Sequence, residues 1–221
     1  MPLRDWRDNA GESATVAMLM MESFSADDNR GRGLCPGQRG GSYSTSVRHR
    51  YNPDVSQEEH KSHAPKAVGC FVLTVSDTRT EATDTGGQAI RDLLESAGHV
   101  VTGRAIVRDD PDAVSAAVTQ QLSDARTQVI VTTGGTGITS RDGTFEAIDR
   151  LLEKRLTGFG ELFRMLSFEQ IGAAAMMSRA TAGTASGKAI FVLPGSPDAV
   201  RLAMTRLIIP ELGHIVQQVS R

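Results

Sequence analysis

The sequence predicts an α/β fold with a mainly parallel sheet and helices on both faces. Apolar runs and segments of helical period alternate along residues 68–217, as in parallel strands joined by crossover helices. The runs at residues 68–75 and 129–133 are apolar almost throughout, which is typical of strands buried on both faces. Unusual loops follow three expected strands, at residues 76–77 and from residues 134 and 194. Because ligands of such folds bind at the carboxyl ends of the strands, we expect these loops to meet at one edge.

The expected elements follow one another in a regular order. Gly98 ends the first helix, because glycine readily adopts the conformation of a helix C-cap. Asp110 and Pro111 start the second helix, where proline fits the first turn. The expected strands are residues 68–75, 99–107, 129–133 and 189–193. The first expected helix covers residues 84–97, and those after the second are residues 144–153, 159–171 and 197–217.

Bulk composition is that of an ordinary globular protein, with 39% hydrophobic and 23% charged residues in a chain of 221. The formal net charge of -2 gives no basic excess for non-specific nucleic-acid binding. No apolar run reaches the length of a membrane span and no signal-peptide pattern is present, so we expect a cytoplasmic protein without membrane contact. Cys35 and Cys70 lie in no disulfide or zinc-binding pattern, and the histidines form no catalytic arrangement.

Residues 1–55 differ in composition from the rest of the chain. They hold seven arginines, no lysine and the only tryptophan, Trp6. Since such a segment buries too little apolar surface to offset chain entropy, we expect a disordered extension. A misassigned start codon and a transit peptide are alternatives, although its acidic residues count against the transit peptide. Residues 56–221 are expected to form the folded domain.

The loop after the third expected strand, with the sequence TGGTG, is suited to binding an anion. Gly134, Gly135 and Gly137 permit positive φ and let the backbone approach a ligand closely. Thr133 and Thr136 add hydroxyl donors. A plain strand-to-helix turn explains these residues equally well, and the loop matches neither a dinucleotide fingerprint nor a P-loop.

Pro194, Gly195 and Ser196 form a similar loop after the last expected strand. Ser196 offers a hydroxyl at a helix N-terminus, where the helix dipole favours anions. An N-cap serine before Pro197 is the structural alternative. Two loops of this kind at one sheet edge favour an anionic ligand.

Several aspartates lie next to these loops. Asp110 is explained as a helix N-cap, which leaves Asp109 without a capping role. Asp77 and Asp142 follow a strand and the TGGTG loop, and each can equally be a turn residue. Because carboxylates repel phosphate, acids beside an anion-binding loop make sense mainly where a divalent cation bridges the two.

Ordered motifs along residues 56–220 resemble the MoaB/MogA family of molybdenum-cofactor biosynthesis proteins, and the segments EHKSHAP and FGELFRMLSF are closer to its MoaB branch. The resemblance implies a three-layer α/β/α sandwich with a mainly parallel sheet, the molybdopterin-binding domain fold. The matching motifs are LTVSDTR (73–79), DTGG (84–87), IVTTGGTG (130–137), RD (141–142), GFGELFRMLSF (158–168) and LPGSP (193–197).

The resemblance also implies an activity: molybdopterin is bound as substrate and receives AMP from MgATP, with release of pyrophosphate. Asp109 and Asp142 match the two critical aspartates of adenylylating members, and we interpret them as holding Mg²⁺ and orienting phosphates. Asp77 joins Asp109 as a candidate metal ligand. The implied residues for molybdopterin or nucleotide are Ser76, Asp77, Asp84, Thr133, Gly134, Gly135, Thr136, Gly137, Pro194, Gly195 and Ser196.

The resemblance leaves alternatives open. Phe145 replaces a common proline, and Arg108 replaces a frequent proline before Asp109, which bears on rate more than on ligand class. A non-catalytic molybdopterin carrier and a scaffold protein are the alternative functions, although the retained aspartates favour the enzyme. A homotrimer or homohexamer and contact with other cofactor-biosynthesis enzymes are implied as partners. The apolar residues of the segment 158–171 fit either core packing or a subunit interface.

Deletion of residues 1–55 is expected to leave a stable oligomer, because the predicted fold draws no core residue from them. Sedimentation velocity and circular dichroism of the shortened chain check this expectation. Loss of folding would show that the extension was misinterpreted.

Overall fold

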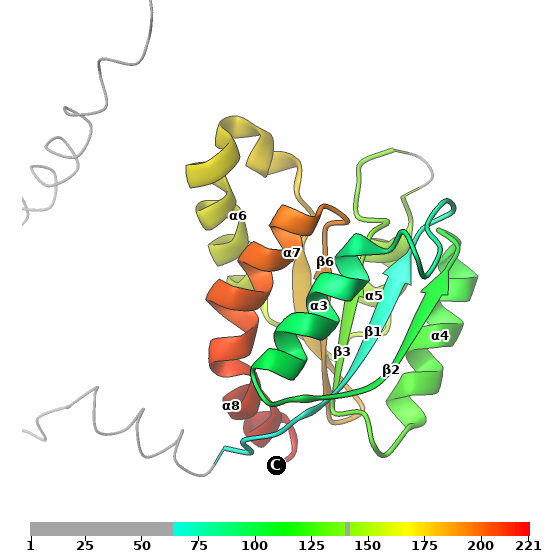
Figure 1. Cartoon of the computed structure of the whole chain (residues 1–221), viewed down its shortest axis with the longest axis vertical. Coiled ribbons are helices and arrows are strands. Elements are labelled where there is room, and N and C mark those ends of the chain that lie inside the picture. Colours follow the sequence, from blue (N-terminus) through cyan, green and yellow to red (C-terminus); the bar gives the residue numbers. More distant parts are fainter. Residues whose placement is uncertain (1–63, 140–141) are drawn as a thin grey trace, which may run out of the picture. The chain divides into compact units, whose positions relative to one another are not determined.

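One sheet organises the described part of the chain, with strand order β2-β1-β3-β6-β5-β4 (Figure 1). The computed structural model describes residues 64–139 and 142–221, so the expectation for residues 1–55 lies outside the described residues. The strands are β1 (Gly69–Val75), β2 (Val100–Val107), β3 (Val129–Thr133), β4 (Lys154–Arg155), β5 (Thr181–Ala185) and β6 (Lys188–Leu193).

The pairing of the strands confirms a mainly parallel sheet. β1 pairs in parallel with β2 and β3, and β3 pairs in parallel with β6. β5 is antiparallel to both β6 and β4. The sequence does not predict β4 and β5, because β4 has two residues and the TAGTA of β5 carries no large apolar side chain. Ser186 and Gly187, both with positive φ, form the tight turn that joins β5 to β6.

Helices cover both faces of this sheet, as the α/β/α prediction required (Figure 1). Alternate strand residues point to opposite faces: Val72 belongs to the core under α3, α7 and α8, and Leu73 to the core under α4 and α5. The helices are α3 (Thr85–Ser96), α4 (Pro111–Ser123), α5 (Thr144–Asp149), α6 (Thr157–Ile171), α7 (Pro197–Ala203) and α8 (Ile209–Val219), with a 3₁₀ helix at Gly172–Met177.

The helix boundaries follow local signals in the sequence. Asp110 caps α4, since its Oδ1 accepts from the amide of Ala113 at 2.8 Å. Gly98 has a φ of 83° just after α3, as expected of a residue past a helix end. The single helix expected over residues 197–217 is divided by a π-helical turn, Met204–Ile208. Pro210 follows that turn and lacks an amide hydrogen for an ordinary helical ladder.

Within the described residues, no helix is both long enough and apolar enough to span a bilayer. Cys70 is a free, buried residue of β1, as expected, and burial raises the pKa of its thiol to about 12.

Candidate functional site

The three loops singled out by the sequence meet at the carboxyl edge of β1, β3 and β6. The amide of Gly134 donates to the carbonyl of Leu193 at 3.1 Å, and Thr133 Oγ1 donates to the carbonyl of Pro194 at 3.0 Å. A Cβ atom added to Gly134 would lie 2.2 Å from the carbonyl oxygen of Val75. Backbone segments distant in the sequence therefore touch here, and glycine is required because its neighbours leave no room for a side chain.

A pocket of about 420 Å³ opens beside this edge. Its lining includes glycines of the TGGTG loop, residues 194–196 and Asp142. It also includes apolar side chains of α6 and the 3₁₀ helix, among them Phe163, Ile171 and Met177. The pocket thus combines a glycine-rich backbone loop with apolar side chains that suit a planar ring.

A second, smaller pocket of about 190 Å³ shares Gly134 and Gly195 with the first. Its lining includes Ser76 and Arg79. Ser76 Oγ accepts from the amides of Thr78 and Arg79 at 3.3 and 3.2 Å, so this serine shapes the loop after β1. Arg79 supplies a cation that the sequence analysis did not single out, although it belongs to the LTVSDTR motif.

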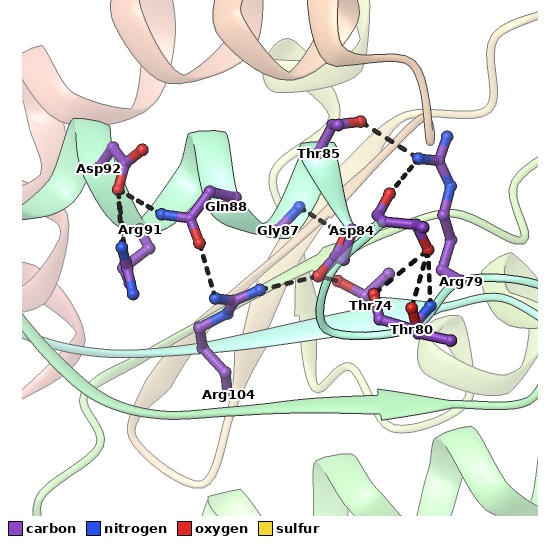
Figure 2. Close-up of polar contacts among 11 residues, drawn as sticks. Thr74, Arg79, Thr80, Asp84, Thr85, Gly87, Gln88, Arg91, Asp92 and Arg104 are labelled. Atoms are coloured by element: carbon purple, nitrogen blue, oxygen red, sulfur yellow. Dashed lines mark hydrogen bonds and ion pairs between the residues drawn. The ribbon is translucent and has the colours of Figure 1, made fainter.

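Asp84 lines the smaller pocket, although only 3% of its side chain is exposed, and acts as the N-cap of α3 (Figure 2). Its Oδ1 accepts from the amide of Gly87 at 2.8 Å. Its Oδ2 accepts from Thr74 Oγ1 at 2.8 Å and from Arg104 Nη2 at 3.0 Å. Since these contacts engage both oxygens, the arrangement suits Asp84 to hold α3 in place beside the pocket.

Arg104→Ala is expected to lower the free energy of unfolding by about 2 kcal/mol, because it leaves the buried carboxylate of Asp84 without its cation. This magnitude is discounted from that of a fully buried pair, since 24% of the Arg104 side chain is exposed. Urea denaturation measures it. Arg91→Ala is the matched control: it removes the exposed pair with Asp92 and should cost about 0.3 kcal/mol. Equal losses in the two variants would contradict the burial argument.

Asp109 lies against the TGGTG loop, at the end of β2. Its amide donates to Asp77 Oδ1 at 3.3 Å, and its Oδ1 accepts from Thr144 Oγ1 at 3.4 Å. A Cβ atom added to Gly135 would lie 2.7 Å from that same oxygen. Burial raises the pKa of Asp109, and the charges of Asp142 and Asp77 add to the rise, while hydrogen bonds from Gly143 and Thr144 oppose it.

Asp142 lies beyond the other end of the same loop. Its Oδ2 accepts from the amide and the hydroxyl of Thr139 at 2.9 and 2.5 Å. These bonds, the hydroxyl's first, hold the pKa of Asp142 below its usual value, so the side chain is ionised at neutral pH. A Cβ atom added to Gly137 would lie 2.6 Å from Asp142 Oδ2. Two carboxylates in different environments therefore lie against the loop, one at Gly135 and the other at Gly137.

The remaining expected site residues lie where the loops meet. Thr136 lines the larger pocket and Thr133 the smaller one. Ser196 caps α7, since its Oγ accepts from the amide of Ala199 at 3.3 Å, and it lines the larger pocket as well. Arg141 lies outside the described residues.

The apolar face expected on α6 divides between core and surface. Phe163 is buried against the sheet, whereas Leu162 and Ile171 are exposed. Met165 and Phe168 are exposed on the same helix, where the sequence alone could not separate core packing from a subunit interface.

The described residues hold no group of three or more His, Cys, Asp or Glu side chains that could bind a metal ion by itself. A magnesium ion that accompanies phosphates needs fewer protein ligands, since one or two carboxylates suffice. Asp77 and Asp109 fit this lesser requirement. The two residues lie together, since the amide of Asp109 donates to the carboxylate of Asp77.

The parallel sheet, the glycine loop and the two carboxylates define a small-molecule-binding α/β domain. A protein-family model described as "Probable molybdopterin binding domain" matches residues 71–214. Molybdenum cofactor biosynthesis protein B of Bacillus cereus is 52% identical over 168 residues, which cover 76% of this chain and 99% of that protein. The chain belongs to the MoaB/MogA family of molybdenum-cofactor biosynthesis proteins, as its motifs had indicated.

Solved structures agree with this assignment and with the fold class. A crystal structure of a molybdenum cofactor biosynthesis protein B is 52% identical, with a TM-score of 0.69, and the match covers 71% of this chain and 98% of that one. The tungsten cofactor synthesizing protein MoaB from Pyrococcus furiosus is 39% identical, with a TM-score of 0.64 and coverage of 72% and 100%. A MogA structure is 30% identical, with a TM-score of 0.61 and coverage of 68% and 99%.

Proposed function

We propose that the protein acts in molybdenum-cofactor biosynthesis as a molybdopterin adenylyltransferase. A terminal phosphate oxygen of molybdopterin would attack the α-phosphorus of ATP, forming a new P–O bond. The bond between the α-phosphorus and the oxygen that bridges to the β-phosphate would break, and pyrophosphate would leave with that electron pair. Such a transfer depends mainly on positioning and on neutralising charge.

One observation carries the proposal: Asp109 and Asp142 both lie against the TGGTG loop, which lines a pocket large enough for a pterin. Cβ atoms added to Gly135 and Gly137 would lie 2.7 and 2.6 Å from an oxygen of Asp109 and Asp142, respectively. A simple anion-binding loop gains nothing from two flanking carboxylates, because they repel the anion. Carboxylates at these places are useful where MgATP must be held beside a second phosphate.

Each part of the site has a distinct role in this proposal. The Thr136 hydroxyl and amides of the TGGTG loop other than that of Gly134 would bind phosphate oxygens. The Thr133 hydroxyl and the Gly134 amide already donate to the carbonyls of Pro194 and Leu193. Asp77 and Asp109 would hold Mg²⁺, which when bound neutralises charge on the phosphates. Asp142, kept ionised by Thr139, would take part in holding Mg²⁺ and would orient the phosphate groups through it. The apolar lining of the larger pocket would take the pterin ring.

Exposed apolar residues support self-association as a homotrimer or homohexamer. Leu162, Met165 and Phe168 recur at helical spacing on α6 and lie exposed in the single chain. Burial of such side chains against another copy would remove them from water.

The test is an assay of the purified chain with molybdopterin, ATP and Mg²⁺, in which adenylylated molybdopterin and pyrophosphate are both measured. Formation of the two products in equal amounts, and their loss in Asp109→Ala, would support the enzyme. Binding of molybdopterin without transfer would refute the proposal in favour of a carrier protein. Omission of Mg²⁺ should stop the transfer and leave the folded state intact.

A further inference from the structure

The side chain of Arg179 joins the TGGTG loop to the segment that contains Asp142. Arg179 follows the 3₁₀ helix and precedes β5. Its Nε donates to the carbonyl oxygen of Thr136 at 3.2 Å, and its Nη2 donates to the carbonyl oxygen of Asp142 at 3.1 Å. Its Nη1 pairs with the carboxylate of Glu146, and its guanidinium carbon lies 5.2 Å from the centre of the Phe145 ring. One guanidinium therefore contacts four residues between 136 and 146.

These contacts need the shape of an arginine. The planar guanidinium offers several N–H groups in fixed directions, so it can bond two carbonyls and a carboxylate at once. A lysine carries its charge on a compact ammonium group that cannot span the same three acceptors. The Phe145 ring lies close enough to the guanidinium for a cation–π contact, which favours one orientation of the group.

The two carbonyls that Arg179 bonds, of Thr136 and Asp142, belong to segments that touch each other within the site. Thr136 precedes Gly137, and a Cβ atom on Gly137 would lie 2.6 Å from Asp142 Oδ2. By holding both carbonyls, the guanidinium fixes the separation between the TGGTG loop and the Asp142 carboxylate. Arg179 itself lines a neighbouring pocket together with Arg155, and it is not among the residues that line the larger pocket. Its influence on a bound ligand therefore passes through Asp142.

We propose that Arg179 is a positioning residue that holds the Asp142 carboxylate against the TGGTG loop, with Phe145 and Glu146 orienting its guanidinium. The kinetic part of this inference rests on the proposed adenylyl transfer. Its structural part, local order in residues 136–139 and 142–146, does not depend on activity.

The experiment compares four variants of the full chain. Arg179→Ala removes every contact, Arg179→Lys keeps the charge alone, and Glu146→Gln removes one ionic partner. Arg155→Ala is the matched control, because Arg155 lines the same neighbouring pocket and pairs with Asp149, another acid of α5. Amide hydrogen exchange is followed by mass spectrometry, and kcat and KM of AMP transfer are measured alongside it.

We expect Arg179→Ala to speed amide exchange at least about fivefold in peptides that cover residues 136–146. Thr136 and Asp142 lose the side-chain hydrogen bonds to their carbonyl oxygens, so local opening becomes less costly. Arg155→Ala should leave these peptides unchanged. The kcat of Arg179→Ala should fall roughly 10- to 100-fold, because small displacements of a positioned group are costly, with less than about a threefold change in KM for molybdopterin. Arg179→Lys should show the same faster exchange and lower kcat as Arg179→Ala.

Unchanged exchange in Arg179→Ala, or full recovery of both properties in Arg179→Lys, would overturn the inference. If Arg179→Ala does not fold, Glu146→Gln decides: exchange no faster than in the Arg155→Ala control would equally overturn it. A wild-type chain without AMP transfer would refute the proposed function, and the exchange measurement alone would then decide the role of Arg179.

Discussion

Asp142→Asn is expected to abolish AMP transfer, with kcat lower by roughly 10³-fold, while molybdopterin still binds. The change is close to isosteric, and the amide oxygen of asparagine can still accept from the amide and the hydroxyl of Thr139. The loop should therefore keep its shape, and only the negative charge is lost. Since the pKa of Asp142 is lowered by those bonds, the wild-type side chain carries that charge at neutral pH.

Transfer rate and binding are measured separately for this variant, by product formation and by equilibrium titration with molybdopterin. Asp149→Asn is the matched control. The pKa of Asp149 is also lowered by a hydrogen-bond partner, Arg155, yet Asp149 does not belong to the loops of the candidate site. The control should keep wild-type activity. Full activity in Asp142→Asn would exclude a role for this carboxylate in the reaction.

The central sheet could be predicted because its signals are local. The apolar runs of β1 and β3 mark strands buried on both faces, and Asp110 and Gly98 mark helix ends through their own backbone preferences. Strand order then brings the loops together, since the carboxyl ends of parallel strands share one edge. In contrast, β5 exists through pairing with β6, and β4 through pairing with β5, and their short sequences carry no period of their own.

The candidate site was only partly predictable, because one residue can serve local structure and ligand together. Asp84 is predicted to have a binding role and lines the smaller pocket, while its oxygens also accept from Gly87, Thr74 and Arg104 (Figure 2). Arg179 carried no signal at all, since 43 positions separate it from Thr136. Its role depends on a tertiary contact, which neither spacing nor local propensity encodes.

Gly134→Ala is expected to lower the free energy of unfolding by about 3 kcal/mol or more and to remove molybdopterin binding. Two penalties combine at this position. Gly134 has a φ of 99°, a conformation that strains an alanine, and the added Cβ would lie 2.2 Å from the carbonyl oxygen of Val75. That oxygen belongs to the backbone at the end of β1, so it cannot yield without displacing the strand. Because Gly134 lines both pockets, any displacement also distorts the ligand site.

Gly98→Ala separates these two penalties. Gly98 has a similar φ of 83°, but a Cβ atom there would meet no atom within 4 Å, so the variant carries the conformational cost alone, about 1 kcal/mol. Urea denaturation of both variants, together with molybdopterin titration, measures the difference. A Gly134→Ala protein as stable as Gly98→Ala, with binding intact, would show that the TGGTG loop can move away from β1. In that case the close contact between Gly134 and the end of β1 would not determine the geometry of the site.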